Sequence, residues 1–300
     1  MTDGIINVYK EKGYTSHDVV AKMRGILKMK KIGHTGTLDP DAEGVLPVCI
    51  GKGTRLVDMI TDRDKTYEAV CRLGIITDTQ DISGKILRTS KAEITPTQLQ
   101  KAVKAYIGEY MQLPPMYSAI KVDGKKLYEL ARQGLEIERE RRKVVIHDIR
   151  LEEFDEVKQE FKVTVQCGKG TYIRTLLHDI GETLGCGAVM VQLLRTAVGG
   201  FSVQEALRLS EIEALVREDK LSEHIVTIER IFEGYSKITI NQEFDRLVHN
   251  GNLFQPSQAQ EEPTVLPGEQ VRVYDSVDKF IGIYEFSPEK GAYTPVKMFL

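Results

Sequence analysis

The 300-residue chain lacks the features that mark membrane and secreted proteins. No apolar run approaches the roughly 20 residues that a membrane-spanning helix needs, and the N-terminus lacks the charged-then-apolar pattern of a signal peptide. The four cysteines, Cys49, Cys71, Cys167 and Cys186, form no Cys-x-x-Cys pair. We therefore expect buried free thiols and a cytoplasmic protein with no membrane partner.

Cofactor motifs are equally scarce. The six histidines are scattered without the spacing of metal ligands. The chain has neither a phosphate-binding loop nor a convincing dinucleotide-binding fingerprint. The sequence thus predicts no metal and no cofactor, so any chemistry must come from the side chains.

Basic residues are slightly outnumbered by acidic ones in the whole chain, and they are unevenly distributed along it. The net charge is −3, whereas residues 1–150 alone carry 26 Lys or Arg against 20 Asp or Glu, and residues 151–300 are correspondingly acidic. A locally basic half is compatible with a face that binds RNA phosphates. Long solvated helices produce the same asymmetry, so charge alone does not decide the partner.

One twelve-residue stretch, GHTGTLDPDAEG at residues 33–44, lies between a helical pattern and an apolar strand-like run. Its glycines and Pro40 indicate a loop, and Asp39 is biased away from helical geometry because it precedes Pro40. A carboxylate on a stiff loop with His34 nearby is a plausible catalytic arrangement. An ordinary Asp-Pro turn and a solvated histidine would leave the same pattern.

Three further segments contain candidate functional residues. Residues 65–73 alternate as a strand does, so Tyr67 should face inward, as a core residue or as part of a site. Asp81 follows in a polar loop, where we expect a turn residue, although Asp81 could also order this loop beside the site. Arg174 comes after the Gly-Lys-Gly of residues 168–170, and by itself it would be taken for a surface arginine. Its planar fork nevertheless makes it the best candidate partner for Asp39.

The chain is expected to fold as two units. Helices are expected near residues 16–29, 55–61 and 95–107. After the glycines at residues 168–170, a short extended piece is expected to lead into a helix that runs through Leu184. The turn at Asp123–Gly124 leads into a shorter helix. Beyond Gly234 the pattern changes to short strands and turns. The apolar positions of these strands are Ile238, Ile240, Val265, Val271, Val273, Ile281, Ile283 and Tyr284.

Taken together, these segments resemble the TruB family of tRNA pseudouridine-55 synthases. The matching stretches are residues 33–44, the Lys-x-Tyr at 65–67, LPPMYSAIKVDGKK at 113–126, GKGTYIRTL at 168–176 and RTAVGGF at 195–201. The resemblance implies an α/β (α+β) pseudouridine-synthase fold, with a mixed, mainly antiparallel sheet flanked by helices and a small C-terminal β PUA-like domain. It divides the chain into a catalytic domain, residues 1–233, and a PUA-like domain, residues 234–300.

The same resemblance implies an isomerase that converts a uridine in the T-loop of tRNA to pseudouridine. Asp39 would be the catalytic residue and His34 would fill the place of the flipped base. Substrate contacts are expected from Tyr67, Tyr172, Arg174 and Leu193, and contacts with the RNA backbone from Lys30, Lys31, Lys121, Lys125 and Lys126. The expected partner is the tRNA T-stem-loop, and the protein is expected to be a monomer.

Three alternatives remain open at this point. The chain could be a non-catalytic protein that binds or folds tRNA. It could be a related synthase that is guided by a separate RNA or acts on ribosomal RNA. It could also be a hydrolase, which would need a second carboxylate or a metal beside Asp39.

Overall fold

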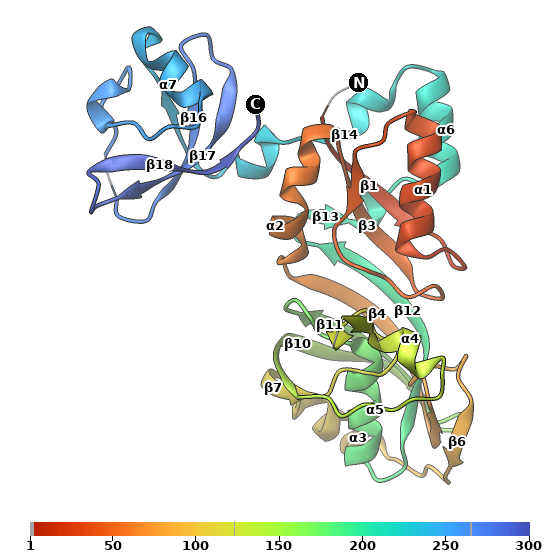
Figure 1. Cartoon of the computed structure of the whole chain (residues 1–300). Coiled ribbons are helices and arrows are strands. Elements are labelled where there is room, and N and C mark those ends of the chain that lie inside the picture. Colours follow the sequence, from red (N-terminus) through yellow and green to blue (C-terminus); the bar gives the residue numbers. More distant parts are fainter. Residues whose placement is uncertain (1–2, 123, 265) are drawn as a thin grey trace.

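The computed structural model describes residues 3–122, 124–264 and 266–300. A long curved sheet with helices against it forms the larger part, and a separate small β-domain lies beyond one end (Figure 1). Two sequence expectations, the turn at Asp123 and the strand position of Val265, lie outside the described residues. Within those residues, no helix has the length and apolarity needed to cross a membrane.

The large sheet is mixed and mainly antiparallel. Its main path runs β14-β1-β3-β12-β4-β11-β10-β7, with β2 paired to β3 and β13 to β12. Within the described residues, β3 and β12 are the one pair of strands in this sheet that runs parallel. The strands are β1 (Gly4–Lys10), β2 (Ile32–His34), β3 (Glu43–Ile50), β4 (Lys65–Leu73), β7 (Gly108–Gln112), β10 (Arg142–Asp155), β11 (Glu160–Cys167), β12 (Ala188–Val198), β13 (Phe201–Ser202) and β14 (Ile225–Thr227).

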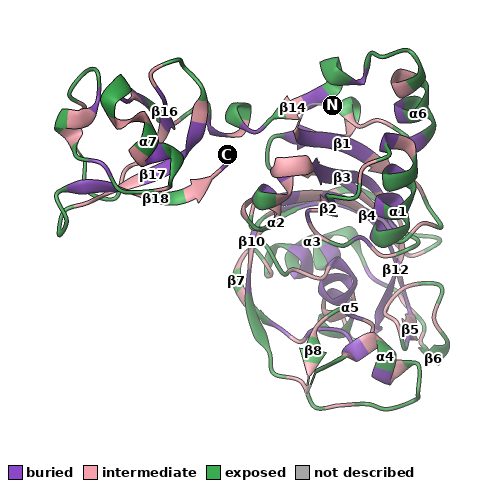
Figure 2. Cartoon of the chain, turned by 45° about the horizontal axis from the view of Figure 1, so that its top comes forward, coloured by how far each residue is buried: buried purple, intermediate pink, exposed green. Residues whose placement is uncertain are grey.

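Helices cover the two halves of this sheet separately. Helices α1 (Ser16–Leu27) and α6 (Leu209–Arg217) pack on the half formed by β1 and β3, whereas α3 (Pro96–Lys104) and α5 (Ile173–Thr183) pack on the half formed by β4, β10 and β11. Figure 2 shows the buried residues following the strands and the inner side of α5. The shorter helices are α2 (Val57–Thr61), α4 (Leu127–Ala131) and α7 (Asp245–His249).

Local chemistry accounts for several element boundaries. Helix α1 starts with a capping box, in which the side chains of Thr15 and Asp18 each accept from the other residue's backbone amide. Helix α3 starts with the equivalent box between Thr95 and Gln98. Strand β4 alternates between buried and half-buried positions along its whole length, as its sequence predicts. The four cysteines are buried and free, as expected.

Some expected boundaries are wrong. The helix expected at residues 55–61 is a 3₁₀ helix, Gly51–Leu56, followed by α2. Helix α3 ends at Lys104, so Ile107, which the expected helix included, lies beyond it and is 44% exposed. The twelve-residue stretch at residues 33–44, called the signature loop below, is not a loop throughout. Strand β2 includes His34, and β3 begins at Glu43.

The small β-domain has one four-stranded sheet, in the order β15-β16-β17-β18. Its strands are β15 (Ser236–Thr239), β16 (Gln270–Tyr274), β17 (Phe280–Ser287) and β18 (Ala292–Met298). The domain is anchored to the larger part by a shared apolar cluster in which Ile283 and Phe299 join Leu56 and Phe232. Two hairpins complete the fold, β5 (Ile75–Thr77) with β6 (Ile86–Thr89), and β8 (Lys121–Val122) with β9 (Lys125–Lys126).

Candidate active site

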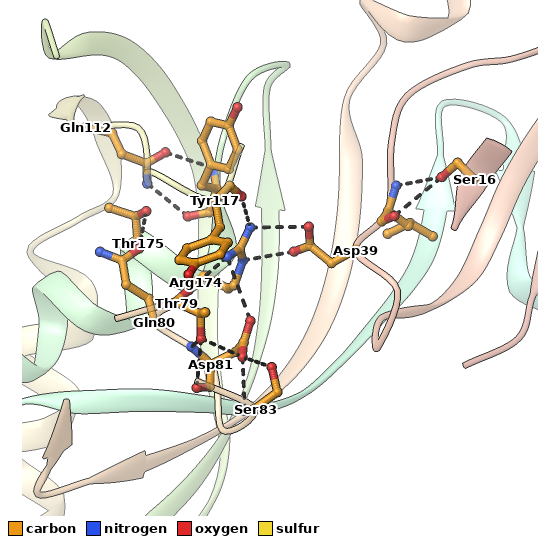
Figure 3. A network of polar contacts seen from close by, with 12 residues as sticks. Ser16, Asp39, Thr79, Gln80, Asp81, Ser83, Gln112, Tyr117, Arg174 and Thr175 are labelled. Carbon is orange, nitrogen blue, oxygen red and sulfur yellow. Dashed lines mark hydrogen bonds and ion pairs between the residues drawn. The ribbon is translucent and has the colours of Figure 1, made fainter. Parts of the chain in front are cut away.

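The loop that carries Asp39 is held by bonds to its backbone on both sides of that residue. The buried Ser16 hydroxyl accepts from the Leu38 amide at 2.9 Å, as Figure 3 shows. The ammonium group of Lys10 donates to the carbonyls of Pro40, at 3.1 Å, and Ala42, at 2.6 Å. Because the atoms that flank Asp39 are fixed in this way, the direction of its carboxylate is largely set by the fold.

Lys10 is completely buried, which sequence reasoning did not anticipate for a lysine at the end of a strand. Burial lowers the pKa of its ammonium to about 8, and the negative charge of Asp39 acts in the opposite direction. Its three donors are directed at backbone carbonyls, the third of which belongs to Glu11 at 3.2 Å. These bonds replace the hydrogen bonds to water that the ammonium loses when it is buried.

Arg174 holds Asp39 through both carboxylate oxygens. Its Nε lies 2.9 Å from Oδ2 and its Nη2 lies 3.2 Å from Oδ1. The same guanidinium donates to the carbonyls of Thr79 and Tyr117, each at 2.8 Å (Figure 3). The Arg174 side chain is 5% exposed and that of Asp39 is 38% exposed. The arginine is thus fixed within the protein, whereas the carboxylate remains accessible to a ligand from outside.

Competing effects set the charge of Asp39. Burial raises the pKa of its carboxyl group, the Arg174 guanidinium lowers it, and the nearby negative charge of Asp81 raises it again, with a net rise. The carboxylate therefore becomes protonated at a higher pH than an ordinary aspartate. The two bonds from Arg174 nevertheless keep the pKa of Asp39 lower than burial alone would make it, and so favour the ionised form.

Asp81 lies on the other side of Arg174, with Oδ2 3.7 Å from Nη1. Its Oδ1 accepts from the Thr79 hydroxyl at 2.8 Å and from the Ser83 amide and hydroxyl at 3.0 and 2.6 Å. The expected turn role is therefore confirmed. The alternative that Asp81 orders the loop beside the site also agrees with the structure, so a second carboxylate does stand next to Asp39 and Arg174. Because Oδ1 accepts all three of these bonds, Asp81 holds the Thr79–Ser83 loop in place beside Arg174.

Tyr67 points inward from β4, as its position in the alternation predicts. It is 8% exposed and lies opposite Arg195 in the ladder between β4 and β12. Burial raises the pKa of the Tyr67 hydroxyl, and the Arg195 guanidinium opposes that rise. Arg195 is 1% exposed and donates to the Val45 carbonyl at 2.7 Å. It also lies close to the signature loop, 3.5 Å from the Gly36 carbonyl.

The remaining base-contact candidates lie around the same region. Tyr172 is the residue immediately before α5, two positions from Arg174, and burial raises the pKa of its hydroxyl. Leu193 is 9% exposed on β12, opposite Ala69. It belongs to one apolar cluster with Tyr67 and with Leu38 of the signature loop. The structure thus brings the candidates together from β4, α5, β12 and the loop.

His34 ends β2 at the edge of this group. Its ring meets that of His17 edge to face, with centroids 5.1 Å apart. Burial lowers the pKa of His34 and the adjacent His17 adds to that effect, so the ring is neutral at neutral pH. Its Nδ1 is buried and has no hydrogen-bond partner among the described residues. A neutral, flat ring of this kind is suited to stacking.

The lysines expected to contact RNA lie in two places. Lys30 and Lys31 are exposed between α1 and β2, and Lys121 and Lys125 are exposed on the β8–β9 hairpin. Lys126 is half-buried, with its ammonium 5.4 Å from the centre of the Tyr128 ring. Among residues 3–122, 124–264 and 266–300, no cluster of three His, Cys, Asp or Glu side chains is arranged to hold a metal ion.

Comparison with known proteins connects this geometry to a family. Residues 24–173 match the N-terminal domain of the TruB family pseudouridylate synthases, and residues 174–233 match the C-terminal domain of tRNA pseudouridylate synthase B. The chain belongs to the TruB family. The Asp39 loop and the Tyr67 strand both lie within the first match, and the boundary between the two matches falls directly before Arg174.

Individual TruB-family relatives match nearly the whole chain. The tRNA pseudouridine synthase B of Lachnoclostridium phytofermentans is 51% identical over 306 residues, which cover 99% of this chain and 100% of that protein. The enzyme of the same name from Clostridium perfringens is 43% identical over 286 residues, 94% of each chain.

A solved structure supports the fold. A chain from the structure of an H/ACA RNP bound to a substrate RNA containing 2′-deoxyuridine superposes with a TM-score of 0.72 at 25% identity. The match covers 99% of this chain and 85% of that one. The expectation of a pseudouridine-synthase fold with a small C-terminal β-domain is therefore confirmed.

Proposed function

We propose that the chain modifies uridine 55 in the T-loop of tRNA and that Asp39 is its catalytic residue. As a member of the TruB family, the chain is an isomerase that converts uridine to pseudouridine in tRNA. One observation carries the proposal for the site. Asp39 is held at both oxygens by a buried arginine and is still 38% exposed, so a ligand can reach it.

The reaction sets few but strict demands on the protein. The bond between C1′ of the ribose and N1 of uracil breaks, the base rotates, and C1′ is joined to C5, from which a proton is lost while N1 gains one. Atoms and electrons balance without an oxidant or a group donor. What is needed is one ionised carboxylate that attacks or stabilises the electron-poor centre. Asp39 meets this demand, and Arg174 keeps it oriented and favours its charge.

The detached base needs a pocket that holds it while it turns. Tyr67, Tyr172 and Leu193 are proposed as the walls of that pocket. Tyr67 and Leu193 are buried and share an apolar cluster with Leu38, the residue before Asp39, and the partly buried Tyr172 lies two residues from Arg174. A uridine in a stacked loop must first be flipped out, at a free-energy cost of roughly a few kcal/mol. His34 is proposed to stack in the vacated position, which its neutral ring favours.

The tRNA backbone is proposed to contact the exposed lysines at both places described above, namely Lys30 and Lys31, and Lys121, Lys125 and Lys126. We further propose that residues 1–233 form the catalytic domain and residues 234–300 a PUA-like domain. The separate four-stranded sheet of residues 236–298 supports that division. A monomer acting in the cytoplasm fits these proposals.

The function is tested by incubating the full chain with an unmodified tRNA transcript and mapping any pseudouridine by position. We expect one modified site, uridine 55, and no product on a transcript with cytidine at that position. Pseudouridine at another position would overturn the proposed target. It would leave the role of Asp39 to be decided by the variant described at the end of the Discussion.

A further inference from the structure

Gln112 is a buried amide that holds the start of helix α5. It is the last residue of β7 and is 1% exposed. Its Oε1 accepts from the backbone amide of Tyr172 at 2.8 Å, and its Nε2 donates to the carbonyl of the same residue at 3.0 Å (Figure 3). A side-chain amide that binds both backbone groups of one residue fixes the position and the orientation of that residue.

The orientation of the Gln112 amide is itself imposed by a second residue of α5. Asp179 accepts from the Tyr110 hydroxyl at 2.9 Å. An ionised carboxylate has no proton to give, so the hydroxyl donates to it, and the hydroxyl oxygen is left free to accept. It accepts from Nε2 of Gln112 at 2.8 Å. That bond directs Nε2 away from the Tyr172 amide and leaves Oε1 to meet it.

The start of α5 depends on this support. Tyr172 precedes the helix, and its side chain makes no capping hydrogen bond. The first amides of a helix have no partner within the helix, so an outside acceptor is needed when they are buried. Arg174, which holds Asp39, lies two residues further on, in the first turn. A shift of Tyr172 therefore moves a wall of the base pocket and the arginine together.

We propose that Gln112, oriented by Tyr110 and Asp179, is a positioning residue for catalysis. Its side-chain hydrogen bonds go to Tyr110 and Tyr172 and not to Asp39, so it acts through Tyr172 and Arg174. Its effect on turnover accordingly rests on the function proposed above. Placing β7 and α5 in register by a chain of polar bonds fixes the Arg174 guanidinium more tightly than apolar packing alone, because hydrogen bonds are directional.

The test is Gln112→Met, which keeps the length of the side chain and removes its hydrogen bonds. We expect the single-turnover rate on tRNA to fall roughly tenfold to a hundredfold, because small misplacements of reacting groups have effects of that size. The dissociation constant for tRNA should stay within about twofold, since the phosphate contacts dominate affinity. The acid limb of the rate should also move to higher pH, because Arg174 would hold Asp39 less tightly.

A matched pair of tyrosine variants separates positioning from general stability. Tyr110→Phe removes the hydroxyl that links Asp179 to Gln112. Tyr106→Phe removes a hydroxyl that bonds Thr183 at 2.8 Å, at the far end of α5. Tyr110→Phe should slow turnover and Tyr106→Phe should not, even if both lower the melting temperature equally. Equal rates in the two variants, or a folded Gln112→Met protein with an unchanged rate, would overturn the proposal.

The two proposals fail in distinguishable ways. If Asp39→Asn still makes pseudouridine, the catalytic assignment is wrong whatever Gln112 does. If Asp39→Asn is inactive while Gln112→Met turns over at the original rate with the original pH profile, only the positioning role is wrong. Thermal unfolding of each variant, followed by circular dichroism, shows whether a variant with a lower rate is still folded.

Discussion

The guanidinium of Arg174 joins the carboxylate of Asp39 through two contacts, at 2.9 and 3.2 Å, across 135 positions of the chain. The aspartate comes from the loop between β2 and β3, and the arginine comes from the first turn of α5. Bonds to backbone atoms hold each partner on its own side. Ser16 and Lys10 hold the loop, and Gln112 holds the helix. Pairing of the two therefore depends on how the two halves of the sheet are assembled.

The first prediction concerns the shape of the Arg174 side chain. Arg174→Lys keeps the positive charge but loses the planar fork that reaches both oxygens and two backbone carbonyls. We expect kcat to fall by roughly a hundredfold, which is typical when a positioning contact is lost. Single-turnover kinetics with tRNA would measure it. A lysine variant as active as the original protein would show that charge alone is sufficient.

The second prediction concerns pH. Because catalysis requires ionised Asp39 and its pKa is raised, activity should be lost on acidification at a higher pH than an ordinary aspartate would give. Asp81→Asn removes a negative charge that contributes to this rise, so the acid limb should move to lower pH. The pH dependence of kcat/KM for both proteins tests this. An acid limb that moved upward would show that Asp81 acts mainly by holding Arg174.

The third prediction separates stacking from proton transfer at His34. If the ring fills the place of the flipped base, His34→Phe should retain much of the activity and His34→Gly should lose it. Replacing a stacked ring by glycine removes roughly 1–3 kcal/mol of stacking free energy. Activity assays on both variants decide the point. Equal collapse of the two would favour a role for the imidazole nitrogens.

The fourth prediction concerns the loop's attachment to the sheet. Gly44 has a φ of +106°, and a Cβ there would lie 2.2 Å from the Arg195 carbonyl oxygen. Gly44→Ala should therefore lower the free energy of unfolding by about 2–4 kcal/mol. Gly25→Ala is the matched control, because a Cβ on this exposed face of α1 has open space around it. It should raise stability by about 0.5–1 kcal/mol. Urea unfolding compares the two variants.

Local patterns predicted much of the fold because they act over short distances. The alternation of β4 and the helix starts near residues 16 and 95 depend on neighbouring residues, and the structure has all of them. The end of α3 was not predictable in the same way. Ile107 follows the helical spacing, yet the chain leaves the helix at Lys104 and enters β7 at Gly108. Tertiary pairing with β10 overrides the local preference there.

The supports of the site were harder to find than the site itself. Asp39 and Arg174 stand in dense motifs, and a carboxylate with an arginine is a natural pair. Lys10 and Arg195 are charged residues at strand positions, which normally predicts exposure, yet both are essentially fully buried. Most of their partners are backbone carbonyls of distant segments, and no side-chain pattern reveals these. For Arg195, which begins the RTAVGGF stretch at residues 195–201, the apolar residues around it in β12 were a further signal of burial.

The most direct test of the central claim is single-turnover conversion of an unmodified tRNA transcript by Asp39→Asn. This variant keeps the size of the side chain and removes its negative charge. We predict no measurable pseudouridine, together with tRNA binding within about threefold of the original protein, because phosphate contacts supply most of the affinity. Pseudouridine formed by the folded variant would contradict the assignment of Asp39 as the catalytic residue.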